Sequence, residues 1–152
     1  MNQPVGIFGG TFDPIHYGHL RTAFELVQGL ALAQVRFLPT GDPPHREAPL
    51  APGALRLEMV RAAVAGEPAF AVDDREIRRS GRSYTFDTLT GLRAELPGRP
   101  LCLLLGMDAF LGMPTWHRWR EIFDLTHVVV AHRPGWKAPI TGDGYLLRDP
   151  LG

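Results

Sequence analysis

The feature that most constrains the fold is an alternation of short apolar runs with longer stretches of helical periodicity. Runs rich in Val, Leu and Phe predict five strands, at residues 5–8, 35–38, 70–72, 101–105 and 128–131. Apolar residues at helical spacing predict helices at residues 18–33, 54–65, 83–96 and 116–125. This alternation is typical of an α/β protein with an open, parallel, five-stranded sheet and helices on both faces.

Length, charge and cysteine content bound the class of protein. A chain of 152 residues with 45% hydrophobic residues predicts one domain over residues 1–152. Sixteen basic residues balance sixteen acidic ones, so no overall field favours nucleic acid or a membrane surface as a partner. Cys102, the one cysteine, cannot form an internal disulfide. Without a signal core or membrane-spanning run, we expect a cytoplasmic protein; a homo-oligomer stays open.

The run VGIFGGTFDPIHYGHL at residues 5–20 joins the first predicted strand to the first predicted helix. Glycines between a strand and a helix N-terminus leave amide groups accessible, and a phosphate can bind there. The glycines of this run are Gly6, Gly9, Gly10 and Gly18. Their spacing matches neither G-x-G-x-x-G nor the lysine-containing Walker loop. The run therefore predicts a phosphate site outside these two common classes.

His16 and His19 lie three residues apart at the predicted helix start, so both would face the same way. A protonated or hydrogen-bonding imidazole there could contact the charge that develops on a phosphoryl group during transfer. The alternative is a pair of helix-capping or surface histidines. A zinc site lacks ligands, because Cys102 belongs to a distant strand and no third histidine lies nearby in the sequence.

Three further motifs follow predicted strands: PPHRE at residues 43–47, SYTFDTL at residues 83–89 and GMDAFLGMPTWHRW at residues 106–119. The carboxyl ends of parallel strands meet at one edge of the sheet, where open α/β sheets bind ligands. His45 and Arg46 would offer donor groups to a phosphate from a proline-rich loop, or form a solvated pair. Ser83 is a candidate helix cap.

GTFDPIHYGH at residues 10–19 resembles the G-T-F-D-P-x-H-x-G-H signature of small nucleotidyltransferases. With the three later motifs, residues 5–135 resemble bacterial nicotinate-nucleotide adenylyltransferases. The resemblance implies a Rossmann-like fold and adenylyl transfer from ATP to nicotinate mononucleotide, with Mg²⁺ held mainly by the ATP phosphates. It implies that His16 and His19 are catalytic. It implies ATP-phosphate contacts at Gly9, Gly10, Thr11, Phe12, His45 and Arg46, and mononucleotide contacts at Thr40, Thr85, Asp108, Trp116 and His117.

Several of these residues have an alternative structural interpretation. Trp116 offers a flat surface on which a pyridine ring can stack, or it is a core aromatic like Trp119. Asp108 resembles a ribose-contacting residue, and on composition alone it could equally be a helix cap. Gly106 and Arg133 are further candidates by resemblance.

The sequence departs from the family pattern in two places. Thr40 stands where asparagine is most frequent before the P-P-H stretch. Relatives also continue into an I-S-S-T-x-x-R-like motif that binds the ATP phosphates, and YLLRDPLG at the end of this chain has no Ser/Thr pair before an arginine. We therefore expect either a fragment or a shortened form. Two alternatives stay open: a pantetheine-phosphate adenylyltransferase-like enzyme, and a nucleotide-binding module with little turnover.

Overall fold

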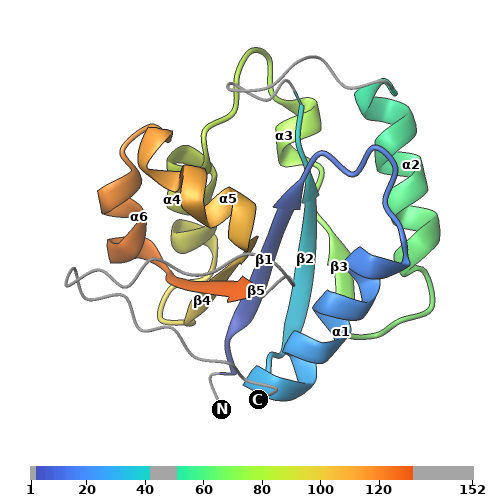
Figure 1. Cartoon of the computed structure of the whole chain (residues 1–152), viewed down its shortest axis with the longest axis horizontal. Helices are drawn as coiled ribbons and strands as arrows, with labels where there is room; N and C mark the ends of the chain where they lie inside the picture. Colours follow the sequence, from blue (N-terminus) through green and yellow to red (C-terminus); the bar gives the residue numbers. More distant parts are fainter. Residues whose placement is uncertain (1–2, 42–50, 132–152) are drawn as a thin grey trace.

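The fold is a five-stranded parallel sheet with helices on both faces (Figure 1). The computed structural model describes residues 3–41 and 51–131. The strand order is β3-β2-β1-β4-β5, and every neighbouring pair is parallel. The strands are β1 (Val5–Gly10), β2 (Gln34–Pro39), β3 (Phe70–Val72), β4 (Leu101–Gly106) and β5 (His127–Ala131). The five predicted strands are thus confirmed, with ends that differ by two residues or fewer.

The helices divide between the two faces of the sheet (Figure 1), and the core accordingly forms two apolar clusters. One face carries α1 (Tyr17–Leu30) and α2 (Gly53–Val64); the other carries α4 (Thr85–Glu95), α5 (Met107–Gly112) and α6 (Trp119–Leu125). Successive side chains of a strand point to opposite faces. In β4, Leu101, Leu103 and Leu105 therefore join the apolar cluster under α4, whereas Cys102 and Leu104 join the cluster under α1. All five are buried, as expected for a central parallel strand.

Two helix ends differ from the prediction for reasons of backbone geometry. The first helix ends at Leu30, because Ala31 adopts the left-handed conformation with φ of 52°. The segment 116–125 is helical only from Trp119. A short 3-10 helix, η1 (Met113–Thr115), precedes it, and Arg118 has φ of 52°. The apolar spacing predicted longer helices, but these left-handed residues interrupt the helical backbone.

Two other differences concern the segments that follow strands. Ser83 is not a helix cap: the N-cap of α4 is Tyr84, and Ser83 is buried. The prediction also missed α5 and a four-residue helix, α3 (Arg75–Arg78). Both are too short for apolar periodicity to reveal them.

Because the strands are parallel, their carboxyl ends and the segments that follow them meet at one edge of the sheet. Gly10 pairs with Pro39 in register, and the amide of Thr40 donates to the carbonyl of Gly10 at 2.9 Å. On the other side of β1, β4 ends at Gly106. The turn after β1 therefore lies between the segments after β2 and β4, at the topological position where such sheets bind ligands.

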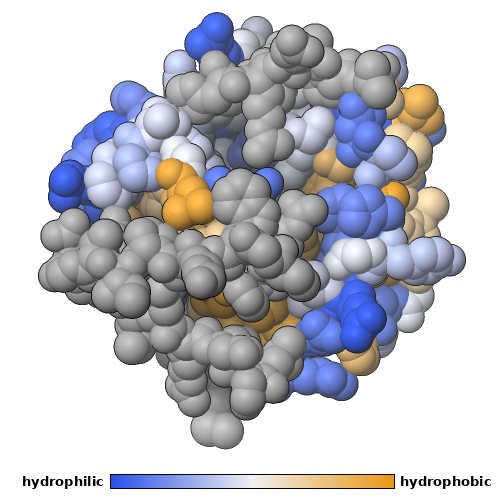
Figure 2. Space-filling view, in the orientation of Figure 1, coloured by the Kyte–Doolittle hydropathy of each residue, from blue (hydrophilic) through white to orange (hydrophobic). Residues whose placement is uncertain are grey.

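The surface carries isolated apolar side chains. Large exposed apolar residues are Tyr17, Phe24, Leu55, Leu111 and Phe123. In Figure 2, apolar residues show at separate places among hydrophilic ones over the coloured part of this face. Within residues 3–41 and 51–131, no helix has both the length and the apolar character needed to cross a membrane.

Candidate active site

The turn after β1 is fixed by the packing of Phe12. Phe12 has φ of 49°, a left-handed conformation that costs a non-glycine residue free energy. Its ring is 3% exposed and lies 5.6 Å from the ring of Phe8, 5.9 Å from Phe37 and 5.1 Å from His19, measured between centroids. A Cβ on Gly10 would come within 3.1 Å of the Phe12 ring. Buried packing thus holds the turn, and Phe12 has only its backbone to offer a phosphate.

Two imidazoles cap the start of α1. His16 is the N-cap, and its Nδ1 accepts a hydrogen bond from the amide of Gly18 at 3.1 Å. The Nδ1 of His19 accepts from the amide of His16, also at 3.1 Å, and the two rings stack with centroids 3.8 Å apart. Gly18 makes this possible, because a Cβ there would lie 2.9 Å from Cε1 of His16. The alternative interpretation, that the two histidines cap the helix, is therefore confirmed.

Capping also determines where each imidazole carries its proton. A neutral imidazole has one donor nitrogen and one acceptor nitrogen. Because Nδ1 accepts in both rings, Nε2 must be the donor in the neutral form of His16 and of His19. Capping and ligand contact are thus compatible: one nitrogen of each ring serves the helix, and the other carries an N–H for a ligand.

His19 is a neutral donor at physiological pH. Burial, and then the charge of His16, lower the pKa of His19 to about 4. Protonation at Nδ1 would also remove the acceptor that binds the His16 amide. The start of α1 therefore combines the neutral Nε2–H donor of His19 with the positive end of the helix dipole, an arrangement suited to charge that develops on phosphoryl oxygens.

Arg56, a residue that the sequence analysis missed, connects this turn to the end of β2. The prediction for α2 rested on apolar residues, yet Leu55 is 48% exposed while Arg56 is 2% exposed. The guanidinium donates to the carbonyl oxygens of Thr11 and Thr40 from Nη1, at 2.8 and 2.6 Å. Charged residues are almost never fully buried without partners, and in a sequence this arginine is indistinguishable from a solvated one.

A cavity of about 170 Å³ lies beside the turn. Its lining combines strand ends with α3, α4 and the segment around η1. Four predicted mononucleotide contacts line it, and so do three residues of the glycine turn: Thr40, Thr85, Trp116 and His117, with Gly9, Gly10 and Thr11. The structure thus places these members of the two predicted sets in one cavity lining. His16 and His19 begin α1 and are not part of this lining.

The two tryptophans differ in their relation to the cavity. Trp116 and Trp119 both pack against the apolar cluster under α4, so each has a core role. Only Trp116 also lines the cavity. The next residue, His117, packs its exposed ring 4.8 Å from the ring of Tyr84. Trp116 is therefore the tryptophan available to a ligand ring.

Two residues of the cavity lining carry a buried hydroxyl without a hydrogen-bond partner among the described residues. These hydroxyls are Thr40 Oγ1 and Ser83 Oγ. A buried hydroxyl without a partner costs about 1–3 kcal/mol, so a ligand that supplies the missing hydrogen bonds is favoured. Ser83, predicted as a helix cap, is thus a cavity residue.

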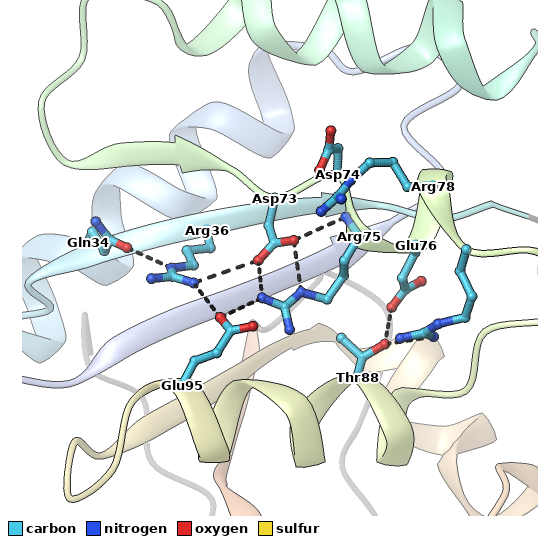
Figure 3. A network of polar contacts seen from close by, with 10 residues as sticks. Gln34, Arg36, Asp73, Asp74, Arg75, Glu76, Arg78, Thr88 and Glu95 are labelled. Atoms are coloured by element: carbon cyan, nitrogen blue, oxygen red, sulfur yellow. Dashed lines mark hydrogen bonds and ion pairs between the residues drawn. The ribbon is translucent and has the colours of Figure 1, made fainter.

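A network of charged residues holds the cavity wall against the sheet (Figure 3). Arg75 donates two hydrogen bonds to the carboxylate of Asp73 in a bidentate pair, at 2.9 and 2.8 Å. It donates a further hydrogen bond of 2.8 Å to Glu95 of α4. Arg36 of β2 lies 3.7 Å from Asp73 and 3.9 Å from Glu95. Burial opposes ionisation of Asp73, but hydrogen bonds and charge from Arg75, with Arg36, hold its pKa below the ordinary value. The network therefore connects β2, α3 and α4.

Glu76 on α3 brings a buried carboxyl group to the cavity lining, and its side chain meets Thr88 of α4 (Figure 3). It is 8% exposed, and its Oε2 accepts a hydrogen bond from Thr88 Oγ1 at 2.7 Å. Burial raises the pKa of Glu76. Arg79 donates to the same Thr88 hydroxyl at 3.4 Å. The sequence analysis missed Glu76, because α3 lies in a charged stretch without a motif.

The remaining predicted residues fall into two groups. Asp108 is exposed in the first turn of α5, and its Oδ1 would lie 2.9 Å from a Cβ on Gly106. The N-cap of α5 is Gly106, so Asp108 is not the helix cap. His45, Arg46 and Arg133 lie outside the described residues. In the described part of the chain, no three His, Cys, Asp or Glu side chains gather closely enough to hold a metal ion.

Comparison with known proteins identifies the family of the chain and agrees with this fold. The cytidylyltransferase-like family matches residues 7–147, and the chain belongs to this family. Within it, the resemblance to nicotinate-nucleotide adenylyltransferases is confirmed. A relative of that name from Aeromonas hydrophila is 55% identical over 137 residues, which are 90% of this chain and 64% of the relative. Another from Hahella chejuensis is 53% identical over 150 residues, 97% of this chain and 68% of the relative.

The chain spans just under two thirds of the length of the Aeromonas hydrophila relative. Among solved structures, a nicotinic acid mononucleotide adenylyltransferase of Plasmodium falciparum complexed with NaAD matches with a TM-score of 0.79. The match covers 90% of this chain and 68% of that one at 18% sequence identity. It confirms the Rossmann-like α/β fold.

Proposed function

We propose that this chain transfers an adenylyl group from Mg-ATP to nicotinate mononucleotide, giving deamido-NAD and pyrophosphate, a reaction of NAD biosynthesis. One observation carries the proposal: the glycine turn beside the two capping histidines shares Gly10 and Thr11 with the cavity that Thr85 and Trp116 line. In the proposal, the site for the ATP phosphates therefore adjoins the site for the mononucleotide, which is the acceptor of the adenylyl group. The names of the relatives support this reaction.

The reaction needs no covalent intermediate and no general base. The phosphate of the mononucleotide is an anion near neutral pH, so its oxygen can attack the α-phosphorus of ATP directly. One phosphorus–oxygen bond forms, and the bond to the departing pyrophosphate breaks. Catalysis then consists of positioning and charge stabilisation. In the proposal, the Nε2–H groups of His16 and His19 donate to phosphate oxygens. The phosphates also approach the backbone of the turn, at Gly9, Gly10, Thr11 and Phe12. Mg²⁺ enters with ATP as part of the substrate.

The acceptor side would select the mononucleotide by shape and hydrogen bonding. Trp116 stacks on the pyridine ring, while the Thr85 hydroxyl and the His117 amide bind its carboxylate. Thr40 adds a hydroxyl that has no hydrogen-bond partner among the described residues. Asp108 at the same sheet edge contacts a ribose. His45 and Arg46 contribute further phosphate contacts by resemblance, and Arg133 is a further candidate residue without an assigned contact.

A pyrophosphate-release assay with Mg-ATP and nicotinate mononucleotide tests the proposal. We expect one pyrophosphate for each deamido-NAD formed, and parallel assays with nicotinamide mononucleotide and pantetheine phosphate measure acceptor preference. Turnover with pantetheine phosphate alone would assign the chain to the related adenylyltransferase. Calorimetric binding of the mononucleotide without pyrophosphate release would identify a binding module instead.

A further inference from the structure

We propose that Arg56 is a positioning residue, which holds the ATP side and the acceptor side of the site at reacting distance. The inference rests on the proposed function. Arg56 belongs to α2, on the opposite face of the sheet from the α4 wall of the cavity. Its side chain is 2% exposed, so it does not contact substrate and acts through the backbone that it binds.

Among the described residues, the guanidinium donates to four carbonyl oxygens from three segments. One nitrogen, Nη1, donates both to Thr11, in the glycine turn, and to Thr40, directly after β2. Nη2 donates to the Gly41 carbonyl at 3.3 Å, and Nε donates to the Ala51 carbonyl at 3.0 Å. Because the guanidinium is planar and rigid, the donors fix the relative positions of these carbonyls. Arg56 thus links the two segments that supply the proposed phosphate and acceptor contacts.

Each side of the site also has contacts of its own that do not involve Arg56. The histidine caps of α1 join residues two and three positions apart. On the cavity wall, Thr88 bonds Glu76, and Arg75 bonds Glu95. Loss of Arg56 should therefore leave each side able to bind its ligand while their relative placement loosens. A misplacement of about 1 Å is enough to cost roughly 100-fold in rate.

The test compares Arg56→Lys with Arg61→Lys on the same helix. Lysine keeps the charge, but its single ammonium nitrogen cannot match the fork that binds four carbonyls. For Arg56→Lys we expect kcat to fall by about 10- to 100-fold, with the KM of ATP and of mononucleotide each within about threefold of wild type. Arg61 is exposed and forms an ion pair with Asp74 at 3.3 Å, so its variant should keep kcat within about twofold. Circular dichroism at the assay temperature verifies that both variants are folded.

Two kinetic results would overturn the inference. An unchanged kcat with a lower melting temperature would mean that Arg56 serves stability alone. A raised KM for one substrate, with kcat unchanged, would mean that it belongs to one side only. If Arg56→Lys does not fold, Arg56→Ala with added methylguanidinium replaces it, and recovery of kcat with methylguanidinium concentration is the expected result; no recovery contradicts the inference.

A binding measurement separates this inference from the proposed function. If the wild-type chain releases no pyrophosphate, the proposed function fails, and calorimetry with an α,β-methylene ATP analogue and nicotinate mononucleotide decides the role of Arg56. We expect each ligand to change the affinity for the other in the wild-type chain, and this coupling to disappear in Arg56→Lys. Equal coupling in both proteins, or none in the wild-type chain, would overturn the inference.

Discussion

The two sides of the site are built from contacts of very different range. At the start of α1, the caps join His16 to Gly18 and to His19, within a single turn of chain. On the cavity wall, Glu76 bonds Thr88 and Arg75 bonds Glu95, which are 12 and 20 residues apart. The contacts at the start of α1 are therefore local in sequence, and a short motif contains them. The contacts on the cavity wall exist only after α3 and α4 have packed on the sheet.

The two sides also differ in chemistry. The α1 side presents N–H donors, including the neutral imidazole of His19. The cavity side presents apolar surface with hydroxyls and the buried carboxyl group of Glu76, whose pKa is raised by burial. One side is thus suited to a phosphate chain and the other to a ring with a few polar substituents. Substitutions that act on one side alone should separate turnover from acceptor binding.

The largest effect is expected for His16→Ala. The variant removes a donor that the proposal places on the transferring phosphoryl group, and the loss of one such donor costs about 100- to 1,000-fold in kcat. It also removes the N-cap bond to Gly18, which costs about 1 kcal/mol of stability. Pyrophosphate release and thermal unfolding measure the two effects separately.

Arg21→Ala is the matched control for His16→Ala, because it alters an exposed ion pair with Glu25 on the same helix. Its kcat should equal that of the wild-type chain. Near-normal turnover of a folded His16→Ala variant would remove the histidine from the mechanism, and the α1 side would then have a capping role only.

Trp116→Ala should act on the acceptor instead of on turnover. Without the ring, stacking on the pyridine is lost, and we expect the mononucleotide KM to rise about tenfold or more while the KM of ATP stays the same. Trp119→Ala is the control: Trp119 packs against the same apolar cluster without lining the cavity. Both variants should lose stability, but only Trp116→Ala should weaken the acceptor. Equal KM values in the two variants would contradict the stacking role.

The contrast in contact range explains how much the sequence could predict. The strands were predictable because short apolar runs alternate with stretches of helical periodicity. The motif at residues 10–19 was predictable because it depends only on the spacing of nearby residues. Arg56 and Glu76 were not, because burial of a charged side chain depends on carbonyls and hydroxyls brought close by tertiary packing. Ser83 shows the same limit: serine before a helix is typical of a cap, yet here it is buried in the cavity lining. Long-range polar partners leave no periodic signal.

A smaller effect is expected for Ser83→Ala. The Ser83 hydroxyl is buried and has no partner in the described part of the chain, so its removal should leave the free protein equally stable or slightly more stable. If the ligand supplies the missing bond, its loss costs about 0.5–1.5 kcal/mol, which corresponds to roughly a 2- to 12-fold rise in mononucleotide KM. Ser80→Ala, at an exposed position three residues earlier, is the control. An unchanged KM in Ser83→Ala would remove this hydroxyl from the acceptor site.

The last prediction concerns the pH dependence of stability and is measured by unfolding, not by activity. Because burial and His16 lower the pKa of His19 to about 4, the folded chain resists a proton that the unfolded chain takes up near pH 6.5. Between these values the unfolded state binds more protons, so the free energy of unfolding should fall as pH drops from 6.5 towards 4 and should gain nothing from His19 above 6.5. His19→Asn has no titrating group at this position. The stability difference between the wild-type chain and this variant should therefore depend on pH only in that window, and NMR of the His19 ring should show protonation near pH 4. A ring that titrates near 6.5 in the folded chain would mean that His19 binds phosphate as a cation, and the contrast between a neutral donor side and a carboxyl-bearing acceptor side would be lost.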